Sequence, residues 1–428
     1  MRIAIFTDTY LPDINGVAQS IDRFAKLLAD DGHQVVIFTT ENRRHKDKAY
    51  KNLTLNRYRS VTFPNYKDIR IALPFILKVV SDLREFQPDI VHIQTPMGIG
   101  WMAIWATKIL KLKNVQTYHT YIPDFLLYLQ PKSFFGIKGV VNFVASSRLM
   151  KFLLEEDLSE TKETNGKLKQ YIQDRLDDAV KKANTITTGE RTKKFAWEYT
   201  KAVYNRANLV LTPSQFLRNE LIKHGVSSPV HALSNGIEFG AFKSKTDYKI
   251  RYKLIYVGRL GYEKHVEIVI RAVRLALAKN SQITLDIIGE GPARKSLEQQ
   301  TKQFGITKNV RFLGFIKREK LFSKYAEYDA FITASTIETQ GIVILEAMAA
   351  GLPVIAVDKL AVSEAVVNSK NGYLSKPFKE KGMAENILKL FSDEKRIKKF
   401  GQYSLSMAES HEIHKCKDKL VEFYKKVA

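Results

Sequence analysis

Short β-branched runs alternate with segments of helical periodicity along nearly the whole chain, and this pattern constrains the fold more than any other feature. Strands that alternate with helices form parallel sheets with helical crossovers, so the pattern predicts two doubly wound, Rossmann-like α/β domains. A length of 428 residues fits two domains of ordinary size. The expected strands are Arg2–Phe6, Gln34–Thr39, Ile90–Gln94, Val115–Tyr118, Leu209–Thr212, Lys253–Val257, Thr284–Ile288, Val310–Leu313, Ala330–Thr333 and Val354–Val357.

The boundary between the two domains is expected at Ser228–Gly236, a segment with Pro, Asn and Gly that is typical of a hinge. We therefore predict a first domain over residues 1–232, a second over 233–410, and a final helix over 411–428 that can pack back on the first domain. The polar, helical stretch at about 133–204 predicts a helical insertion in the first domain. In such a fold, the ligand is expected in the interdomain cleft.

Composition restricts the class of protein. Cys416 is the only cysteine, which excludes a disulfide within the chain and a cysteine-built metal site, and it favours a reducing, cytoplasmic location. A strand begins directly at Met1, and no run reaches the roughly eighteen uncharged apolar residues of a spanning helix, so we expect neither a leader nor a transmembrane segment. The net charge of +23 attracts nucleic acid, anionic lipid or nucleotide phosphates, and charge alone leaves these three open.

The most informative motif is Ser335–Pro353, in which a polar turn with Gly341 leads into a short apolar helix. The backbone N–H groups at the start of that helix, together with its dipole, predict a site for a diphosphate. Glu338 and Glu346 flank this site, roughly 10 Å apart at a helical rise of about 1.5 Å per residue. Because a retaining glycosidase pair needs about 5–5.5 Å, the two glutamates are expected to hold hydroxyls at opposite ends of a long ligand. The alternative is a pair of solvated glutamates, but an unpaired charge at Glu346 in an apolar helix is unfavourable.

A second motif places two cations in one loop. Gly258 directly follows a predicted strand and is small enough to allow the backbone to approach a ligand closely. Arg259 and Lys264 follow it before the next helix begins. Both cations can face a diphosphate leaving group and neutralise the charge that develops as a glycosidic bond breaks. The spacing alone is a weak signal, and its position at a strand end strengthens it.

Two features of the first domain point to ligand contact. Gly16 opens an amphipathic helix after the first strand, and a complete G-x-G-x-x-G is absent, which argues against a dinucleotide redox cofactor. His119 follows a strand, at the edge where open α/β sheets bind ligands. A histidine at such a position is also commonly structural, so both interpretations stay open here.

Together these motifs resemble glycosyltransferase family 4, whose members share the GT-B fold, and the resemblance covers nearly the whole chain outside the insertion. Besides the two glutamates, it depends on Gly258-Arg259 with Glu263-Lys264, on Ser234-Asn235-Gly236-Ile237-Glu238 and on Gly289-Glu290-Gly291-Pro292. It implies a retaining transfer from a nucleotide-diphosphate sugar. In such a transfer the leaving phosphate helps to deprotonate the acceptor, and neither a metal nor another cofactor is required.

The resemblance also implies a role for each matching residue. Glu338 contacts the donor hexose, and Glu346 holds the ribose. Arg259 and Lys264 bind the diphosphate, and His119 lies beside the transferred sugar. The other expected donor-binding positions are Gly16, Gly258, Gly291, Gln340, Gly341 and Ile342.

A narrower resemblance is to bacterial diacylglycerol glucosyltransferases, and it depends on Phe6-Thr7-Asp8-Thr9-Tyr10, Thr117-Tyr118-His119-Thr120 and Glu338-Thr339-Gln340-Gly341. It implies transfer of glucose from UDP-glucose to diacylglycerol by a protein bound peripherally to the inner face of the cell membrane. Apolar and basic residues after His119 fit contact with such a lipid and an anionic surface. They are Tyr121, Phe125, Lys132, Phe134, Phe135 and Lys138. The alternative is a helix whose apolar face packs on the domain core.

Three other functions agree with parts of the sequence. A nucleic-acid binder would account for the charge, but no RNA-binding or helix-turn-helix motif is present, so no nucleic-acid partner is expected. A sugar-nucleotide epimerase shares the fold class. A transferase that uses GDP-mannose or a soluble saccharide acceptor is the nearest alternative to a lipid glucosyltransferase. None of these features predicts the oligomeric state.

Overall fold

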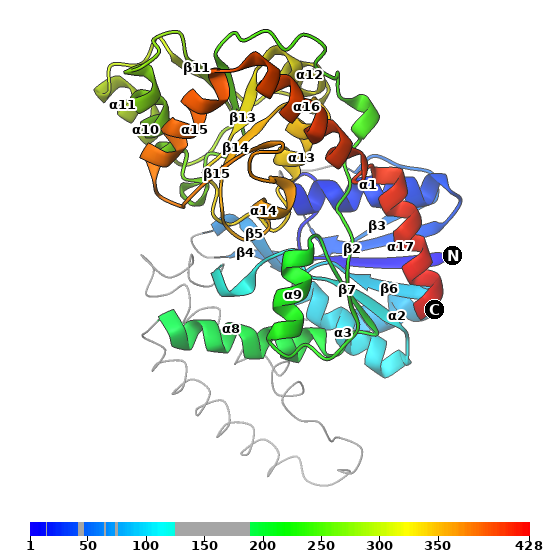
Figure 1. Cartoon of the computed structure of the whole chain (residues 1–428). Helices are drawn as coiled ribbons and strands as arrows, with labels where there is room; N and C mark the ends of the chain where they lie inside the picture. The colour runs from blue at the N-terminus through cyan, green and yellow to red at the C-terminus, as the bar shows by residue number, and fades with distance from the viewer. Residues whose placement is uncertain (14, 42–46, 64–65, 73–75, 125–188) are drawn as a thin grey trace. The chain divides into compact units, whose positions relative to one another are not determined.

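The computed structural model describes residues 1–13, 15–41, 47–63, 66–72, 76–124 and 189–428 (Figure 1). The chain divides into two compact units, each built on its own β-sheet. Unit 1 comprises Met1–Thr212, Arg218–His231 and Phe423–Ala428, and unit 2 comprises Pro213–Leu217 and Ala232–Glu422. The chain therefore leaves unit 1 briefly at Pro213–Leu217, leaves it again after His231 and returns to it at Phe423.

Unit 1 contains a seven-stranded sheet with the strand order β3-β2-β1-β6-β7-β8-β9. The strands are β1 (Arg2–Thr7), β2 (Gln34–Thr40), β3 (Leu53–Tyr58), β6 (Ile90–Ile93), β7 (Asn114–Thr117), β8 (Leu209–Thr212) and β9 (Val230–Ala232). A separate antiparallel hairpin consists of β4 (Ser60–Phe63) and β5 (Tyr66–Ala72). The chain crosses the sheet in one direction from β1 to β3 and in the other from β6 to β9, so the strand order reverses between β1 and β6.

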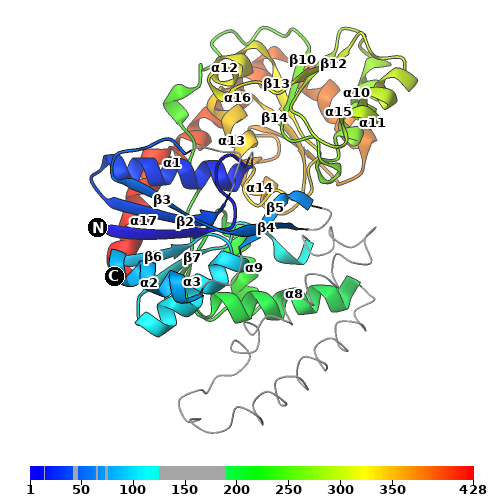
Figure 2. The same ribbon diagram turned by 180° about the vertical axis from the view of Figure 1, so that it is seen from behind.

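Helices cover both faces of this sheet. They are α1 (Gly16–Asp30), α2 (Ile76–Phe86), α3 (Gly98–Leu110), α8 (Gly189–Tyr204) and α9 (Gln215–Lys223). Because parallel crossovers are right-handed, the opposite directions of β1–α1–β2 and β6–α3–β7 place α1 and α3 on opposite faces. Figure 2 shows α2 beside α3, against which it packs. Helix α1 begins at a typical N-cap, where Asn15 Oδ1 accepts a hydrogen bond from the Ala18 N–H at 2.8 Å.

Unit 2 contains a six-stranded parallel sheet with the order β12-β11-β10-β13-β14-β15, which reverses between β10 and β13. The strands are β10 (Lys253–Val257), β11 (Thr284–Ile288), β12 (Val310–Gly314), β13 (Ala330–Ile332), β14 (Val354–Val357) and β15 (Gly372–Ser375). The α-helices are α10 (Val266–Leu277), α11 (Arg294–Gln303), α12 (Arg318–Lys324), α13 (Ile342–Ala349), α14 (Val362–Ala365), α15 (Glu380–Phe391) and α16 (Glu394–Glu409). A further helix, α17 (Ile413–Val427), begins in unit 2 and ends in unit 1. Three short 3-10 helices are η1 (Phe239–Ala241), η2 (Tyr262–Lys264) and η3 (Tyr325–Glu327).

The core of unit 2 has two layers, one on each face of its sheet. Successive side chains of a strand point to opposite faces, and β10 follows this rule. Leu254 and Tyr256 pack in the layer that includes α10 and α15, whereas Ile255 and Val257 pack in the layer that includes α13. All four side chains are buried, so β10 is a central strand that is covered on both faces.

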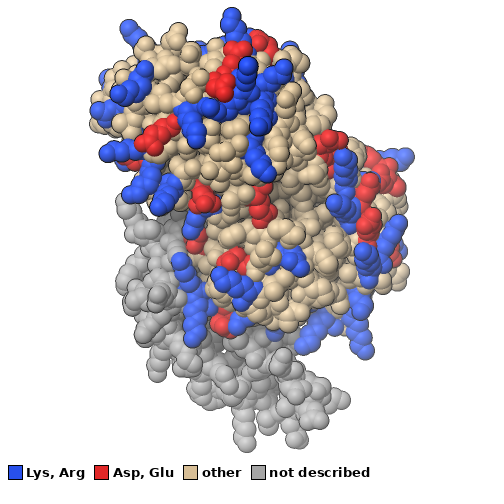
Figure 3. All heavy atoms as spheres, in the orientation of Figure 1, with Lys and Arg blue, Asp and Glu red and all other residues tan. Residues whose placement is uncertain are grey.

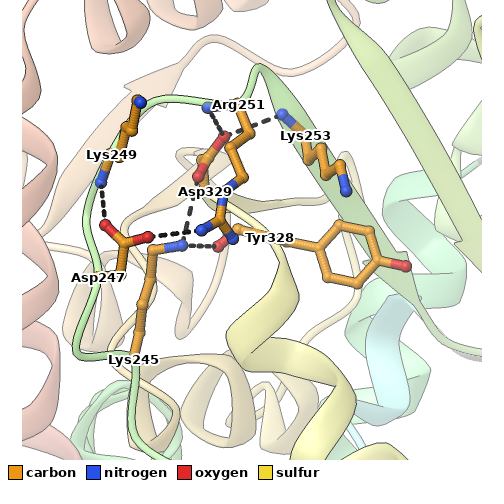
Figure 4. Close-up of polar contacts among 7 residues, drawn as sticks. All are labelled: Lys245, Asp247, Lys249, Arg251, Lys253, Tyr328 and Asp329. Atoms are coloured by element: carbon orange, nitrogen blue, oxygen red, sulfur yellow. Dashed lines mark hydrogen bonds and ion pairs between the residues drawn. The ribbon is translucent and has the colours of Figure 1, made fainter.

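A buried ion pair fixes the starts of two neighbouring strands in unit 2 (Figure 4). Lys245 Nζ lies 3.3 Å from Asp329 Oδ1 and donates a hydrogen bond to the Tyr328 carbonyl oxygen at 2.8 Å. Asp329 Oδ2 accepts hydrogen bonds from the backbone N–H groups of Arg251 at 2.8 Å and Lys253 at 3.0 Å. The Lys245 and Asp329 side chains are 1% and 0% exposed, so each charge depends on the other for compensation.

Charged side chains are scattered over the face drawn in Figure 3, where Lys and Arg outnumber Asp and Glu but are interleaved with them. A group of basic side chains lies over α16, whose exposed residues include Lys395, Lys398 and Lys399. In the described ranges, no helix is both long and apolar enough to cross a bilayer.

The architecture predicted from the sequence is confirmed. All ten predicted strands are present, with ends that differ by one residue at most. Periodicity did not reveal β3, β15, the β4–β5 hairpin or β9, and β9 lies within the segment predicted as a hinge. The part of the predicted insertion that the structure describes forms α8, and residues 133–188 lie outside the described ranges.

Candidate functional site

Two loops of unit 2 meet beside the reversal in strand order. One follows β10 and carries Lys264 in η2, and the other follows the adjacent strand β13 and carries Glu338. Lys264 Nζ donates a hydrogen bond to Glu338 Oε1 at 2.7 Å. In open α/β sheets, ligands bind at the carboxyl ends of the strands beside such a reversal. The structure thus joins two of the predicted site residues at the position where this type of sheet binds ligands.

The charge state of Glu338 depends on Lys264. The Glu338 side chain is 13% exposed, and burial acts to raise the pKa of its carboxyl. The Lys264 ammonium outweighs this effect through its charge and its hydrogen bond, so the pKa lies below its usual value. Glu338 is therefore ionised at neutral pH and can accept hydrogen bonds from hydroxyl groups.

The turn before α13 is shaped by Gly341 and Gln340. Gly341 has a φ of +80°, which favours glycine, and it directly precedes Ile342, the first residue of the helix. Gln340 is buried, donates a hydrogen bond to Ser234 Oγ at 2.6 Å and accepts one from the Asn235 N–H at 3.1 Å. Because the Gln340 side chain is already engaged, we expect any anion at this turn to bind the backbone N–H groups that open α13.

Glu346 lies inside the otherwise apolar helix α13, and its side chain is 4% exposed. Arg318, the first residue of α12, joins two carboxylates: its Nη1 lies 2.5 Å from Glu346 Oε1, and its Nε lies 3.0 Å from Glu238 Oε2. Tyr325 donates a hydrogen bond to Glu346 Oε2 at 3.3 Å. Both carboxylate oxygens of Glu346 are held, so its orientation is set before a ligand binds.

Glycines allow the loops after β10 and β11 to approach each other. A Cβ atom on Gly289 would lie 1.9 Å from the carbonyl oxygen of Gly258, and one on Gly291 would lie 2.5 Å from that of Leu260. Both distances are shorter than Cβ atoms tolerate, so backbone packing alone requires glycine at these two positions. A contact between Gly258 or Gly291 and a donor stays a prediction.

Three other predicted donor positions lie at the ends of elements. Arg259 is exposed in the loop between β10 and η2. Ile342 begins α13. In unit 1, Gly16 is the exposed first residue of α1, which follows β1 beside the reversal in that sheet. Their positions agree with ligand contact at the carboxyl edges of the two sheets.

A polar network lies at the carboxyl ends of β6 and β7 in unit 1. His119 Nε2 lies 2.6 Å from Gln94 Oε1. Gln94 Nε2 lies 3.2 Å from His92 Nδ1, and the Tyr424 hydroxyl lies 2.6 Å from that same nitrogen. His119 is 8% exposed, and burial lowers the pKa of its imidazole to about 4, so the ring is neutral at neutral pH.

A buried carboxylate follows β1. Asp8 Oδ2 accepts a hydrogen bond from Thr95 Oγ1 at 2.7 Å, and Oδ1 accepts one from the Ile99 N–H at 2.8 Å. Asp8 is 7% exposed, and burial raises the pKa of its carboxyl to about 6 in spite of these hydrogen bonds. Asp8 therefore ties the end of β1 to the first turn of α3.

Among the predicted acceptor residues, Tyr121 lies within the described ranges and is partly buried. Its hydroxyl donates a hydrogen bond to Glu220 Oε2 at 3.0 Å, and its ring meets the Trp197 ring edge-on at 5.8 Å. These contacts fix Tyr121 within unit 1. The other predicted acceptor and membrane residues lie outside the described ranges, and they are Phe125, Lys132, Phe134, Phe135 and Lys138.

Comparisons with known proteins agree with this arrangement. The family model described as Glycosyltransferase Family 4 matches residues 14–157 and 185–239, and the model described as Glycosyl transferases group 1 matches residues 241–407. The alpha-monoglucosyldiacylglycerol synthase of Streptococcus pneumoniae is 31% identical over 361 residues, which cover 83% of this chain and 71% of that relative. The chain is a family 4 glycosyltransferase.

This glycosyltransferase is also similar to a GDP-mannose-dependent alpha-mannosyltransferase of Mycolicibacterium smegmatis, at 25% identity over 87% of this chain and 84% of the relative. Among solved structures, Anabaena Alr3699/HepE in complex with UDP matches with a TM-score of 0.69 and 17% identity over 100% of both chains. The likeness supports the GT-B fold, in agreement with the two parallel sheets. Within the described part of this glycosyltransferase, no group of three or more His, Cys, Asp or Glu side chains could hold a metal ion.

Several residues of this glycosyltransferase site were missed in the sequence. Arg318 gave no signal because its role depends on tertiary contacts with Glu346 and Glu238. Gln94 could have been found, since the predicted strand that it ends neighbours the strand before His119. The distance estimated between the two motif glutamates used helical rise throughout, but α13 begins only at Ile342, so that estimate does not apply to residues 338–341.

Proposed function

We propose that this glycosyltransferase moves glucose from UDP-glucose to diacylglycerol, with retention of anomeric configuration and without a metal ion. The observation that carries the proposal is the pair formed by Lys264 and Glu338, 2.7 Å apart, beside the strand reversal in unit 2. A cation for a diphosphate and a carboxylate for sugar hydroxyls stand together there, as a bound sugar nucleotide requires.

The proposed division of roles is the one that the family resemblance implies, and the positions of these groups support it. Lys264 and Arg259 bind the diphosphate and stabilise the charge that grows on it during bond cleavage. Glu338 accepts hydrogen bonds from the hexose hydroxyls. Glu346, already oriented by Arg318, accepts hydrogen bonds from the ribose hydroxyls.

The proposed reaction exchanges one bond at the anomeric carbon. The bond from that carbon to the diphosphate oxygen breaks, and a bond to the hydroxyl oxygen of the acceptor forms on the same face. The proton of the acceptor hydroxyl passes to the leaving phosphate oxygen. The chain itself then needs to supply only charge stabilisation and orientation.

The acceptor is proposed from similarity and charge together. The Streptococcus pneumoniae relative is named as an alpha-monoglucosyldiacylglycerol synthase. The net charge of +23 favours attachment to an anionic bilayer surface, where such a lipid is found. We therefore propose peripheral binding to the inner face of the cell membrane, with residues after His119 in contact with the lipid.

A second candidate is transfer of mannose from GDP-mannose, which the relative from Mycolicibacterium smegmatis favours. Labelled UDP-glucose and GDP-mannose, each incubated with the enzyme and vesicles that contain diacylglycerol, distinguish the two. Label from UDP-glucose in the organic phase, with an α-linked product by NMR and full activity in EDTA, is the expected result. Vesicles without diacylglycerol serve as the control. Label from GDP-mannose alone would favour the second candidate, and label confined to the aqueous phase would contradict a lipid acceptor.

Membrane attachment is tested by sedimentation with vesicles. We expect binding to vesicles that contain anionic lipid, weaker binding to zwitterionic vesicles, and a loss of binding at high salt. The double variant Phe134→Asp/Phe135→Asp should reduce sedimentation. Equal binding of the variant and the unchanged chain would remove these two residues from the proposed membrane contact.

A further inference from the structure

The hydrogen bonds that reach His119 continue through four further side chains of unit 1. Gln94 links His119 to His92, and the Tyr424 hydroxyl contacts the same ring nitrogen of His92, Nδ1, that Gln94 contacts. His92 Nε2 lies 2.6 Å from Thr117 Oγ1. His92, Gln94, Thr117 and His119 are all less than 9% exposed, and Tyr424 is fully buried. Five buried polar groups thus form one continuous network.

With the Gln94 amide oriented as the structure has it, the chemistry of the groups sets the direction of each hydrogen bond. The Gln94 amide nitrogen can only donate, so His92 Nδ1 accepts from it and also from the Tyr424 hydroxyl. His92 therefore carries its proton on Nε2 and donates it to Thr117 Oγ1. The Gln94 amide oxygen can only accept, so His119 donates from Nε2.

We infer that Gln94, His92 and Tyr424 are positioning residues that hold His119 with its proton on Nε2 and leave Nδ1 as an acceptor for a ligand hydroxyl. Tyr424 belongs to the returning segment Phe423–Ala428, so the network joins the C-terminal helix to a residue of the proposed site. The inference rests on the proposed function, in which His119 lies beside the transferred sugar.

Burial strengthens the argument from geometry. Burial lowers the pKa of His119 to about 4 and that of His92 to about 3, so neither imidazole carries a second proton at neutral pH. A neutral imidazole whose Nε2 donates has an unprotonated Nδ1. Among the described residues, His119 Nδ1 is buried and has no hydrogen-bond partner. A buried acceptor without a partner is unfavourable, so a hydrogen bond from a ligand hydroxyl would satisfy this nitrogen.

Tyr424 contacts His92 through ring packing as well as through its hydroxyl group. The Tyr424 ring meets the His92 ring edge-on, with centroids 5.6 Å apart. Tyr424→Phe keeps this packing and removes only the donor to His92 Nδ1. Gln94→Leu removes both the acceptor for His119 and the second donor to His92, with little change in side-chain volume.

Nitrogen-15-labelled histidine read by NMR on the full chain tests the tautomer directly. We expect His119, identified by the signal that His119→Gln removes, to show a protonated Nε2 and an unprotonated Nδ1 at neutral pH. Gln94→Leu should convert this signal to a mixture of the two tautomers. A wild-type His119 protonated on Nδ1, or a tautomer unchanged in Gln94→Leu, overturns the inference. This result does not depend on any enzymatic activity.

Kinetics test the positioning role separately. We expect kcat/KM for the sugar donor to fall about 100-fold in Gln94→Leu and roughly fivefold in Tyr424→Phe. The Kd for UDP, which lacks the sugar, should stay unchanged in both. Gln116→Leu is the matched control, because Gln116 is an equally buried residue of β7 whose amide donates to Asn114 instead.

Each kinetic outcome has one meaning. Full kcat/KM in Gln94→Leu, or an equal loss in the Gln116→Leu control, contradicts the positioning role. If Gln94→Leu lowers both kcat/KM and the affinity for UDP, Gln94 has a general structural role, and this result also contradicts the positioning role. If the unchanged chain transfers no sugar to any acceptor, the proposed function fails, while the NMR result still decides the tautomer of His119.

Discussion

Lys264 Nζ lies 2.7 Å from Glu338 Oε1, so the proposed phosphate-binding cation and the proposed sugar-binding carboxylate neutralise each other before a donor arrives. With the proposed roles, a donor diphosphate would compete with Glu338 for the ammonium group, and the displaced carboxylate would accept hydrogen bonds from the hexose. We therefore expect donor binding to rearrange an existing ion pair.

Removing either partner of this pair should abolish sugar transfer while the chain stays folded. We expect kcat to fall about 100- to 1000-fold in Lys264→Ala and in Glu338→Ala, because each variant loses a charge that acts on the transition state. Lys324→Ala, which breaks the partly exposed pair with Glu327, is the matched control and should keep full activity. Near-normal turnover in either site variant would disprove the role given to it.

Arg318→Met should weaken binding of UDP at least tenfold, because Glu346 then loses the charged hydrogen bond that orients it. Calorimetric titration with UDP measures the effect without any acceptor. Arg311→Met is the control, since Arg311 also pairs with a carboxylate of unit 2, Asp286, at 2.6 Å. Equal loss of UDP affinity in both variants would show that the effect is not specific to Glu346.

Asp8 should make the stability of unit 1 depend on pH. Burial raises the pKa of its carboxyl from 3.8 to about 6, so the folded state holds more protons than the unfolded state between these values. The contribution of Asp8 to the free energy of unfolding is therefore fully present below about pH 4 and is lost as pH rises through about 6, by about 3 kcal/mol. Asp8→Asn removes this dependence.

Tryptophan fluorescence in urea measures this prediction, because all three tryptophans, Trp101, Trp105 and Trp197, belong to unit 1. We expect the unfolding midpoint of the unchanged chain, relative to that of Asp8→Asn, to decrease between pH 4 and pH 7. A difference between the two proteins that is constant over this range would refute the assignment of a raised pKa to Asp8.

Lys245→Met should destabilise unit 2 strongly, because it leaves the buried charge of Asp329 without its cation. Breaking a buried pair from one side costs about 3–5 kcal/mol, and for a unit of this size the calorimetric Tm should fall by roughly 6–20 °C. Asp247→Asn removes an exposed partner of Arg251 and should leave the Tm unchanged. If the Tm of Lys245→Met equals that of the unchanged chain, the ion pair is not required for the stability of unit 2.

Strong local patterns allowed most of the fold to be predicted. The apolar run Leu254–Val257 identifies β10 because it is buried on both faces. The polar edge strand Leu53–Tyr58 and the glycine-led Gly372–Ser375 lack such a pattern, and both were missed. Short apolar runs between helices thus identify central strands better than edge strands.

The residue types of the site were predictable, but their partners were not. Lys264 and Glu338 are 74 positions apart, and only the pairing of β10 with β13 brings their loops together. The same holds for Gln94 and His119, which are 25 positions apart at the ends of neighbouring strands. Motif spacing describes one loop at a time, whereas these contacts depend on the order of strands in the sheet.

The hydrogen bond between His92 and Tyr424 joins residues 332 positions apart, and it has a consequence for synthesis on the ribosome. At about 5–20 residues per second, Tyr424 emerges roughly 17–66 s after His92. During that interval the nascent unit 1 has its histidines and Gln94 in place but lacks the hydroxyl that completes their network. Helix α17 therefore supplies this hydroxyl to unit 1 long after the strands of that unit are translated, and a chain arrested before Phe423 would have a nearly complete unit 1 in which His92 lacks the Tyr424 donor.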